Sequence, residues 1–175
     1  MPIDEARPFI PLSIAVMTVS DTRTLEDDRS GDTLVKRLED AGHKLADRSI
    51  VKDDVDALQN QVKAWVADDT IEAIITTGGT GFTGRDVTPD ALEPLFDKRM
   101  EGFSVLFHQY SATTVGVSTM QSRAFGGQAG DSFIFCLPGS NGAVKDGWDK
   151  VIKAQLDSRH KPCNLVELLP RLGEH

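Results

Sequence analysis

The sequence predicts an α/β protein, a three-layer αβα sandwich of the Rossmann-like type around a mostly parallel sheet, in a single domain. This prediction rests on three apolar, largely β-branched or aromatic runs: Leu12–Val19, Ile71–Thr77 and Ser132–Leu137. Strands that helices cover on both faces are apolar almost throughout. Each run leads into a polar or glycine-rich loop and then a segment with helical periodicity. This order is typical of parallel strands joined by crossover helices.

Between the first two apolar runs, the chain predicts two helices and an edge strand. Ser30–Ala41 places its apolar side chains on one helical face, with Gly42 as the C-cap. Leu45–Val51 is interrupted by charged residues, which suits a strand at the edge of the sheet. A second helix follows, and either Asp53 or Asp54 is its N-cap. A capping role is therefore the structural alternative for Asp53.

The second half of the chain contains three further predicted helices. Thr88 as the N-cap and Pro89 at the first helical position begin a helix that extends to Lys98. Gly102–Ala112 predicts another helix, whereas Thr113–Gly130 has no clear preference. This segment is either a polar connection or a source of phosphate donors, for which the candidates are Ser118, Thr119, Ser122 and Arg123. A last amphipathic helix follows the third apolar run.

Composition predicts a cytoplasmic protein with one core. The chain has 175 residues, enough for one globular core but short for two. A net charge of −8 argues against non-specific binding to nucleic acid or to an anionic membrane. No apolar run approaches the length of a membrane span, and the first residues lack the apolar segment of a signal peptide. Cys136 and Cys163 predict reduced thiols rather than a disulfide or a zinc site.

We divide the chain into an N-terminal arm (residues 1–11), a central domain (residues 12–158) and a C-terminal tail (residues 159–175). The tail contains several leucines between two prolines. An apolar segment of this kind needs a surface to cover, which either its own domain or a neighbouring subunit could provide.

The second apolar run leads into a glycine-rich loop formed by Gly78, Gly79, Thr80 and Gly81. Glycine permits positive φ angles and lets backbone amides approach an anion. Arg85 and Asp86 follow; a guanidinium suits a phosphate and a carboxylate suits a hydrated Mg²⁺. The loop formally satisfies GxGxxG, as in a nucleotide-binding oxidoreductase, but the helix begins only after the last glycine. A plain glycine-rich turn with solvated Arg85 and Asp86 is the structural alternative.

Polar or glycine residues follow every predicted parallel strand. Because the carboxyl ends of parallel strands meet at one edge of the sheet, we expect these residues to form one site. The segments are Ser20-Asp21, Asp53-Asp54, Gly78–Asp86 and Gly139-Ser140. Two glycine loops suit a ligand with more than one phosphate, and the acidic loops suit an accompanying metal ion.

The run TTGGTGFTGRDVTPDA is similar to the pterin-binding signature of the molybdenum cofactor biosynthesis family that includes the bacterial MogA and MoaB proteins and the gephyrin G-domain. FIPLSIAVMTVSDTR, SIVKDD, STMQSRAFGG, LPGS and RHKPCN extend the resemblance, which is greatest to the MoaB-type members, over nearly the whole chain. It implies a MogA-like fold and a homo-oligomer, trimeric or hexameric. It also implies that the protein binds molybdopterin and adenylylates it with Mg²⁺ and ATP. A non-catalytic carrier or assembly partner of other pathway proteins is the alternative.

The resemblance also implies roles for individual residues. Asp53 and Asp86 would be the catalytic, Mg²⁺-binding carboxylates. The phosphate- or pterin-binding residues would be Ser20, Asp21, Gly78, Gly79, Thr80, Gly81, Arg85, Ser122, Gly139 and Ser140. The chain departs from the common family pattern at Lys52 and Gly84, where proline is frequent, and in the second glycine loop, Ser140-Asn141-Gly142.

Overall fold

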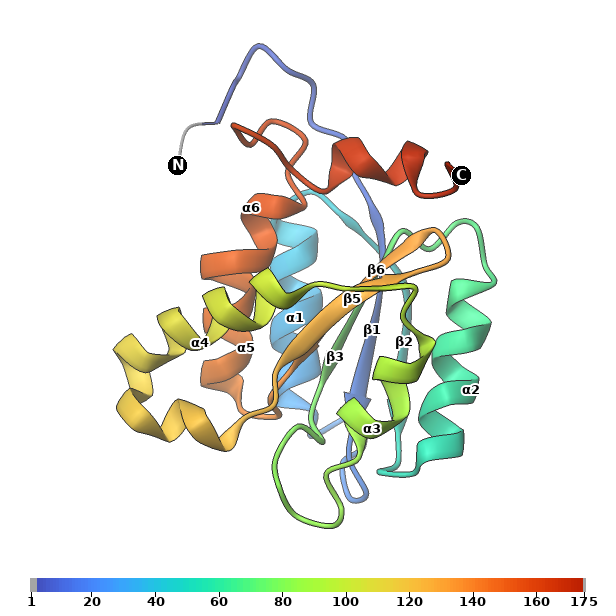
Figure 1. The fold of residues 1–175 in the computed structure, drawn as a ribbon, viewed down its shortest axis with the longest axis vertical. Coiled ribbons are helices and arrows are strands. Elements are labelled where there is room, and N and C mark those ends of the chain that lie inside the picture. The colour runs from blue at the N-terminus through green and yellow to red at the C-terminus, as the bar shows by residue number, and fades with distance from the viewer. Residues whose placement is uncertain (1–2, 175) are drawn as a thin grey trace.

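The computed structural model describes residues 3–174, and a six-stranded mixed sheet lies at its centre (Figure 1). The strands lie in the order β2-β1-β3-β6-β5-β4. Their bounds are β1 Ser13–Val19, β2 Lys44–Val51, β3 Ala73–Thr77, β4 Lys98–Arg99, β5 Phe125–Ala129 and β6 Ser132–Leu137. The first four in this order are parallel, and β5 and β4 add an antiparallel edge. The predicted mostly parallel sheet is confirmed, with β2 at an edge.

Helices cover both faces of this sheet, so the predicted three-layer sandwich is also confirmed (Figure 1). One face carries α1 (Arg29–Asp40), α4 (Glu101–Val115) and α5 (Asn141–Gly147). The other carries α2 (Val55–Val66) and α3 (Thr88–Leu92). The remaining helical segments are the 3₁₀ turns Glu93–Leu95, Gly116–Gln121 and Val166–Arg171, the π-helical turn Trp148–Ile152 and α6 Lys153–Gln155. Among residues 3–174, no helix is both long and apolar enough to cross a membrane.

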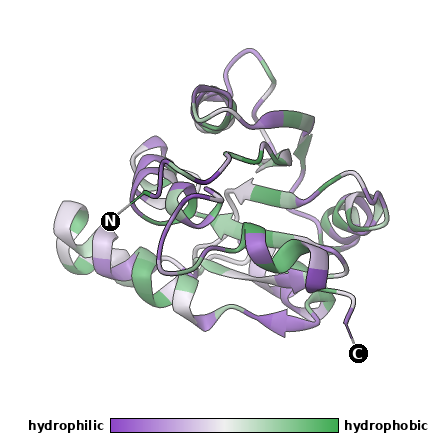
Figure 2. Cartoon of the chain, turned by 90° about the horizontal axis from the view of Figure 1, so that it is seen from above, coloured by the Kyte–Doolittle hydropathy of each residue, from purple (hydrophilic) through white to green (hydrophobic). Residues whose placement is uncertain are grey.

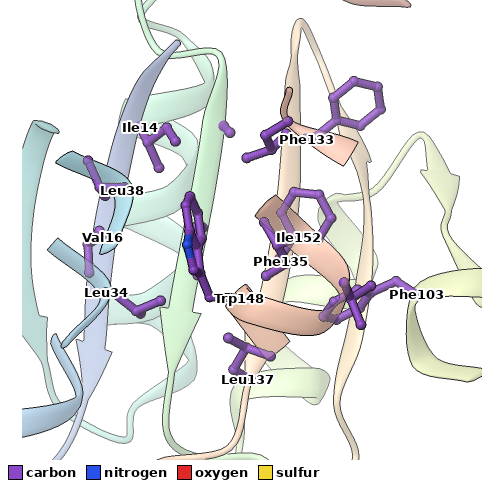
Figure 3. Packing of buried hydrophobic residues seen from close by; sticks show 14 of the residues in the cluster. Ile14, Val16, Leu34, Leu38, Phe103, Phe133, Phe135, Leu137, Trp148 and Ile152 are labelled. Carbon is purple, nitrogen blue, oxygen red and sulfur yellow. The ribbon is translucent and has the colours of Figure 1, made fainter. Parts of the chain in front are cut away.

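The sheet separates two hydrophobic cores. In one core, Trp148 packs with Phe103 and Phe135 between the sheet and the helices α1, α4 and α5 (Figure 3). In the other, Leu58 and Trp65 of α2 pack on the opposite face of the same strands. Hydrophobic residues accordingly concentrate in the central strands, whereas the surrounding helices are mixed (Figure 2). This two-sided burial explains why the strands are apolar runs rather than alternating sequences.

Two predictions about the second half of the chain were wrong in detail. Thr88 is the first residue of α3 rather than its N-cap, and its hydroxyl donates to the carbonyl of Gly78 (2.9 Å). The helix ends at Leu92 instead of Lys98, because Pro94 cannot donate the next helical hydrogen bond.

The sequence also gave no indication of β5, which contains Gly126 and Gly127. Both glycines are needed there: a Cβ at Gly126 would lie 2.9 Å from the Ile134 carbonyl oxygen, and one at Gly127 would lie 2.4 Å from the Phe96 ring. Glycine weakens a strand in isolation, so the close packing that requires it is invisible to local propensity.

The C-terminal tail packs on its own domain. Val166 is buried in the same core as Trp148, and three leucines of the tail are half-buried against this cluster. Arg7 of the N-terminal arm forms an ion pair with Glu167, and Asp4 forms one with Lys161 (2.6 Å). Arm and tail lie together at the end of the molecule opposite the carboxyl ends of the parallel strands (Figure 1).

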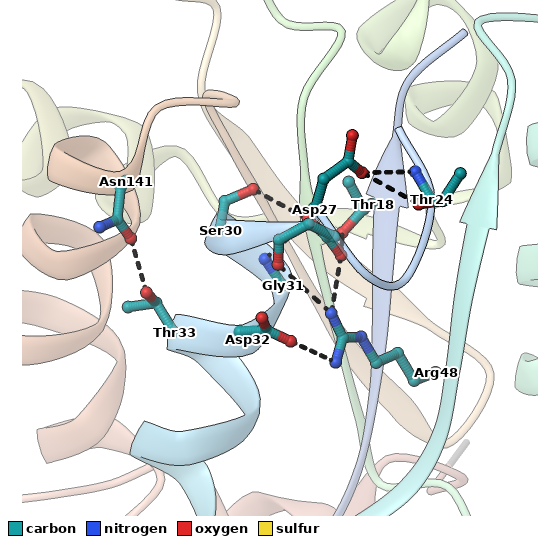
Figure 4. A network of polar contacts seen from close by, with 10 residues as sticks. Thr18, Thr24, Asp27, Ser30, Gly31, Asp32, Thr33, Arg48 and Asn141 are labelled. Atoms are coloured by element: carbon teal, nitrogen blue, oxygen red, sulfur yellow. Dashed lines mark hydrogen bonds and ion pairs between the residues drawn. The ribbon is translucent and has the colours of Figure 1, made fainter. Parts of the chain in front are cut away.

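A buried ion pair fixes α1 to the sheet (Figure 4). The side chain of Asp28 is completely buried and accepts hydrogen bonds from Thr18 Oγ1 (2.7 Å), Arg48 Nη2 (2.9 Å) and the Gly31 amide (3.0 Å). Burial alone would raise the pKa of Asp28, but these hydrogen bonds and the Arg48 charge outweigh it and lower the pKa. Asp28 also serves as the N-cap of α1, so one carboxylate joins β1, β2 and this helix.

We expect Asp28→Ala to lower the free energy of unfolding by about 3–5 kcal/mol, because it leaves the Arg48 guanidinium without its buried partner. Urea unfolding at pH 7 measures this loss. Lys36→Ala is the matched control: it removes an exposed ion pair with Asp40 and should cost less than about 1 kcal/mol. Equal effects of the two substitutions would contradict the assignment.

Candidate functional site

A cavity of about 370 Å³ opens where β1, β3 and β6 end. Its walls come from loops that are far apart in sequence, as expected from the shared edge of parallel strands. Of the predicted site residues, the structure brings together Ser20, Asp53, Gly78, Gly79, Thr80, Gly81, Arg85, Asp86, Ser122 and Gly139. Asp21 and Ser140 do not line this cavity. Asp21 contacts Arg85 in its wall, and Ser140 lines an adjoining cavity.

The glycine loop begins with a backbone geometry that a side chain would not tolerate. Gly78 and Gly79 have φ angles of 109° and 67°. A Cβ at Gly78 would lie 2.3 Å from the Val19 carbonyl oxygen, and one at Gly79 would lie 2.2 Å from Thr88 Oγ1. Gly78 donates its amide to Leu137 O (2.9 Å), which extends the β3–β6 pairing into the loop. Glycine at these positions therefore has a structural cause as well as a functional interpretation.

Of the two predicted catalytic carboxylates, Asp53 accepts fewer hydrogen bonds from the protein. It is half-buried, with Oδ1 3.0 Å from where a Gly79 Cβ would be, and no side chain among residues 3–174 donates a hydrogen bond to its carboxylate. Burial and the charges of Asp21 and Asp86 raise its pKa. The neighbouring Asp54 is the N-cap of α2, accepting from the Ala57 amide (2.8 Å). Capping therefore does not account for Asp53.

Asp86, in contrast, is held within its own loop. Its Oδ2 accepts hydrogen bonds from the amide (3.0 Å) and the hydroxyl (2.6 Å) of Thr83. Partial burial opposes ionisation, but these hydrogen bonds prevail and lower the pKa of Asp86. A Cβ at Gly81 would lie 2.8 Å from the same oxygen, so the carboxylate packs against the glycine loop.

Asp21 connects three loops from outside the cavity. Its Oδ2 accepts from Arg85 Nε (2.9 Å), and its Oδ1 accepts from the Asp53 amide (3.2 Å). The Arg85 hydrogen bonds lower the pKa of Asp21. Asp21 thus positions the predicted metal-binding carboxylate and the predicted phosphate-binding guanidinium together, although the sequence assigned it to direct contact with a ligand.

The remaining predicted residues have mixed positions. The hydroxyl of Ser20 accepts from the amides of Thr22 (3.3 Å) and Arg23 (3.2 Å), which shapes the β1–α1 loop. Ser122 lies on the wall between the cavity and an adjoining one. Ser140 lines the adjoining cavity, and its hydroxyl is the N-cap of α5, accepting from the Ala143 amide (3.1 Å).

Several residues of the site were not predicted. Arg23, Ser30 and Gln121 line the cavity. Arg123 holds the glycine loop in shape, since its guanidinium donates to the carbonyl oxygens of Gly81 (2.9 Å) and Asp86 (2.7 Å). Arg123 was predicted only as a possible phosphate donor. Its contacts with the glycine loop span about forty residues of sequence, so no local pattern indicates this structural role.

The carboxylates of the cavity fit a magnesium ion whose coordination would be completed by water and by the phosphate oxygens of a bound substrate. No group of three or more His, Cys, Asp or Glu side chains among residues 3–174 could hold a metal ion by itself. Mg²⁺ usually takes one or two carboxylates together with substrate phosphates and water. Asp53, which lacks a side-chain partner and is surrounded by other acids, is the carboxylate best suited to this ion, with Asp86 as the second.

Residues 15–158 match the family described as a probable molybdopterin binding domain, which is most of the chain. The chain belongs to this family. Relatives of the chain carry the name molybdenum cofactor biosynthesis protein B, so the resemblance of the glycine-loop signature is confirmed.

The similarity of the chain to these relatives extends over most of their length. Molybdenum cofactor biosynthesis protein B of Escherichia coli K12 is 46% identical over 156 residues, covering 89% of this chain and 92% of the relative. The Bacillus subtilis protein is 45% identical over 142 residues, covering 81% and 84%.

Solved structures of proteins with related names have the same fold as this chain. A crystal structure of molybdenum cofactor biosynthesis protein B matches with a TM-score of 0.83 and 41% identity, covering 86% of this chain and 94% of that one. The tungsten cofactor synthesizing protein MoaB from Pyrococcus furiosus matches with a TM-score of 0.70 and 33% identity, covering 83% and 92%. The chain therefore shares both the fold and the cofactor-biosynthesis family of these proteins.

Replacing Asp53 and replacing Asp86 should have opposite effects on the stability of the chain. The pKa of Asp53 is raised on folding, so its ionised form disfavours the fold above that pKa, and Asp53→Asn should raise the melting temperature at pH 7. Asp86 has a lowered pKa, so its contribution is favourable at neutral pH, and Asp86→Asn should lower the melting temperature.

Thermal unfolding of both variants from pH 7 down to about pH 3 tests the sign of each shift. The gain of Asp53→Asn should vanish below about pH 4, where Asp53 is protonated in both folded and unfolded chains. The loss of Asp86→Asn should shrink as the pH falls through the lowered pKa of Asp86. A destabilised Asp53→Asn variant at pH 7 would show that this carboxylate is structural.

Proposed function

We propose that this protein binds molybdopterin and adenylylates it, with ATP and Mg²⁺ as co-substrates. The observation that supports this proposal most is the juxtaposition of a glycine loop with Asp53 and Asp86 in one cavity. Transfer of an adenylyl group joins two phosphates that repel each other, so the protein needs anion donors and acidic metal ligands side by side.

The backbone supplies the anion donors. Gly79 and Thr80 direct no amide hydrogen bond to any group among residues 3–174, whereas Gly78 uses its amide in the sheet. Free amides in a loop before a helix are well suited to phosphate oxygens. In this assignment the glycine loop receives the terminal phosphate of molybdopterin, and Arg85 adds a guanidinium at the mouth of the cavity.

In the reaction, an oxygen of that terminal phosphate forms a bond to the α-phosphorus of ATP. The bond between this phosphorus and the bridging oxygen breaks, and the electron pair leaves with pyrophosphate. Magnesium bound by Asp53 and Asp86 would supply charge neutralisation at the phosphates. The protein contributes position and preorganised charge, which is the main demand of such displacements.

An adjoining cavity of about 390 Å³ suits the pterin ring. It shares Gln121, Ser122 and Pro138 with the first cavity and is lined by Phe107 and several hydroxyl groups. An aromatic side chain together with hydroxyls suits a flat ring with polar edges. The shared wall allows one ligand to place its ring here and its phosphate in the glycine loop.

One observation favours the second candidate function, a carrier that presents molybdopterin without turning over ATP. Arg85 is bound by Asp21 and the Asp86 carboxylate is bound by Thr83, so one predicted phosphate-binding group and one predicted catalytic carboxylate already have partners within the protein. A carrier predicts tight binding of molybdopterin without pyrophosphate release.

An exposed apolar surface supports the further proposal of a homo-oligomer. It lies on α4 and the following 3₁₀ turn and consists of Val105, Leu106, Tyr110, Val115, Val117 and Met120, which are 36–83% exposed. Contiguous apolar surfaces of this kind mark interfaces. We assign this surface to contact with a second copy of the chain, in a trimer or hexamer.

We expect the purified protein to release pyrophosphate when it is given molybdopterin, ATP and Mg²⁺. Asp53→Asn should slow this release by about 100-fold or more, because it removes a charge that acts at the phosphates. The control is Asp56→Asn, in the first turn of α2 and outside the cavity, which should leave the rate within about twofold. Binding of molybdopterin without any pyrophosphate from the native protein would instead support the carrier.

Charges placed on the apolar surface should separate the subunits. We expect Val117→Glu combined with Met120→Glu to yield monomers in sedimentation velocity runs, because burying two carboxylates in the interface is unfavourable. Leu25→Glu, at an exposed leucine outside this surface, is the control. A native chain that sediments as a monomer at micromolar concentration would contradict the oligomer proposal.

A further inference from the structure

A third cavity of about 390 Å³ lies between the β1–α1 loop and the edge strand β2. It adjoins the first cavity, which contains the glycine loop. We call it the Arg23–Lys52 cavity; its walls are Ser20, Asp21, Arg23, Thr24, Leu25, Arg48, Ser49, Ile50 and Lys52. Ser20 and Arg23 also line the first cavity. Because the two cavities share this wall, one ligand could extend from the first into the second.

The charge of the Arg23–Lys52 cavity differs from that of its neighbour. Three cationic side chains, Arg23, Arg48 and Lys52, line it together with one acid, Asp21, which is already bound by Arg85. Within residues 3–174, Arg23 and Lys52 form no ion pair. Two cations without acidic partners beside a cavity that contains two carboxylates create a local site for an anion.

Arg48 adds a buried donor without an acceptor. Its Nη2 is bound by Asp28 (2.9 Å) and its Nη1 by Asp32 (2.8 Å), so the guanidinium is fixed in place. Its Nε is buried and has no hydrogen-bond partner among residues 3–174. Buried donors of this kind are rare in folded proteins and call for a missing partner.

We infer that the Arg23–Lys52 cavity binds a diphosphate: the β- and γ-phosphates of the nucleotide and then the pyrophosphate that leaves. This inference rests on the proposed adenylyl transfer for the source of the diphosphate. When the bond to the α-phosphorus breaks, negative charge develops on the departing bridging oxygen. Arg23, on the shared wall, and Lys52, further out, stabilise that charge.

Titration calorimetry with inorganic pyrophosphate, without nucleotide or molybdopterin, tests the inference. We expect one site per chain, and Arg23→Ala and Lys52→Ala should each weaken binding by about tenfold, as is typical when a charged hydrogen bond is lost. Lys44→Ala, at the other end of β2 and outside the cavity, should change affinity by less than about twofold. Circular dichroism verifies that each variant is folded.

Absence of binding by the native protein, or equal binding by all variants, would overturn the inference. Its failure and that of the proposed function are distinguishable. Site-specific pyrophosphate binding without adenylyl transfer would support the anion cavity and refute the reaction. Adenylyl transfer at unchanged rates in Arg23→Ala and Lys52→Ala would refute the diphosphate role of the cavity and leave the reaction intact.

Discussion

The site depends on a close approach of backbones at the ends of β1, β3 and β6. Gly78 lies against the carbonyl of Val19, and a Cβ at Gly139 would lie 3.2 Å from the Gly78 Cα. Since no side chain fits between these strand ends, the backbone itself forms the floor of the cavity, and the amides of Gly79 and Thr80 beside it are available to an anion. The tight packing that the fold requires is thus also what a phosphate site requires.

Around this floor, loops with different roles are joined by a few polar contacts. Asp21 holds Arg85 and the Asp53 amide, while Arg123 holds the carbonyl oxygens of the glycine loop. Among residues 3–174, no side chain donates a hydrogen bond to Asp53, which lies near the acids Asp21 and Asp86, and this arrangement disfavours the fold in the absence of a cation. Natural proteins accept such local instability mainly at functional sites. Structural and functional carboxylates are therefore distinguished by their partners rather than by sequence.

The sequence predicted the architecture well where local pattern and tertiary structure agree. The apolar runs that became β1, β3 and β6 are buried on both faces, so composition alone identified them. It failed at β5, where two glycines are set by packing against Ile134 and Phe96. The glycine loop, Asp53 and Asp86 were brought together as expected, because strand ends in a parallel sheet share one edge. Arg23 was not predicted, and Arg123 was predicted as a possible phosphate donor rather than as the side chain that holds the glycine loop, since both positions depend on contacts between distant loops.

Mass spectrometry of the small molecules, after incubation with molybdopterin, ATP and Mg²⁺, tests the central claim most directly. The account predicts a new species whose mass is that of molybdopterin joined to an adenylyl group, and predicts that it is absent when Asp53→Asn replaces the native protein. Molybdopterin that remains bound to the protein and unmodified, with ATP intact, would contradict the claim of catalysis.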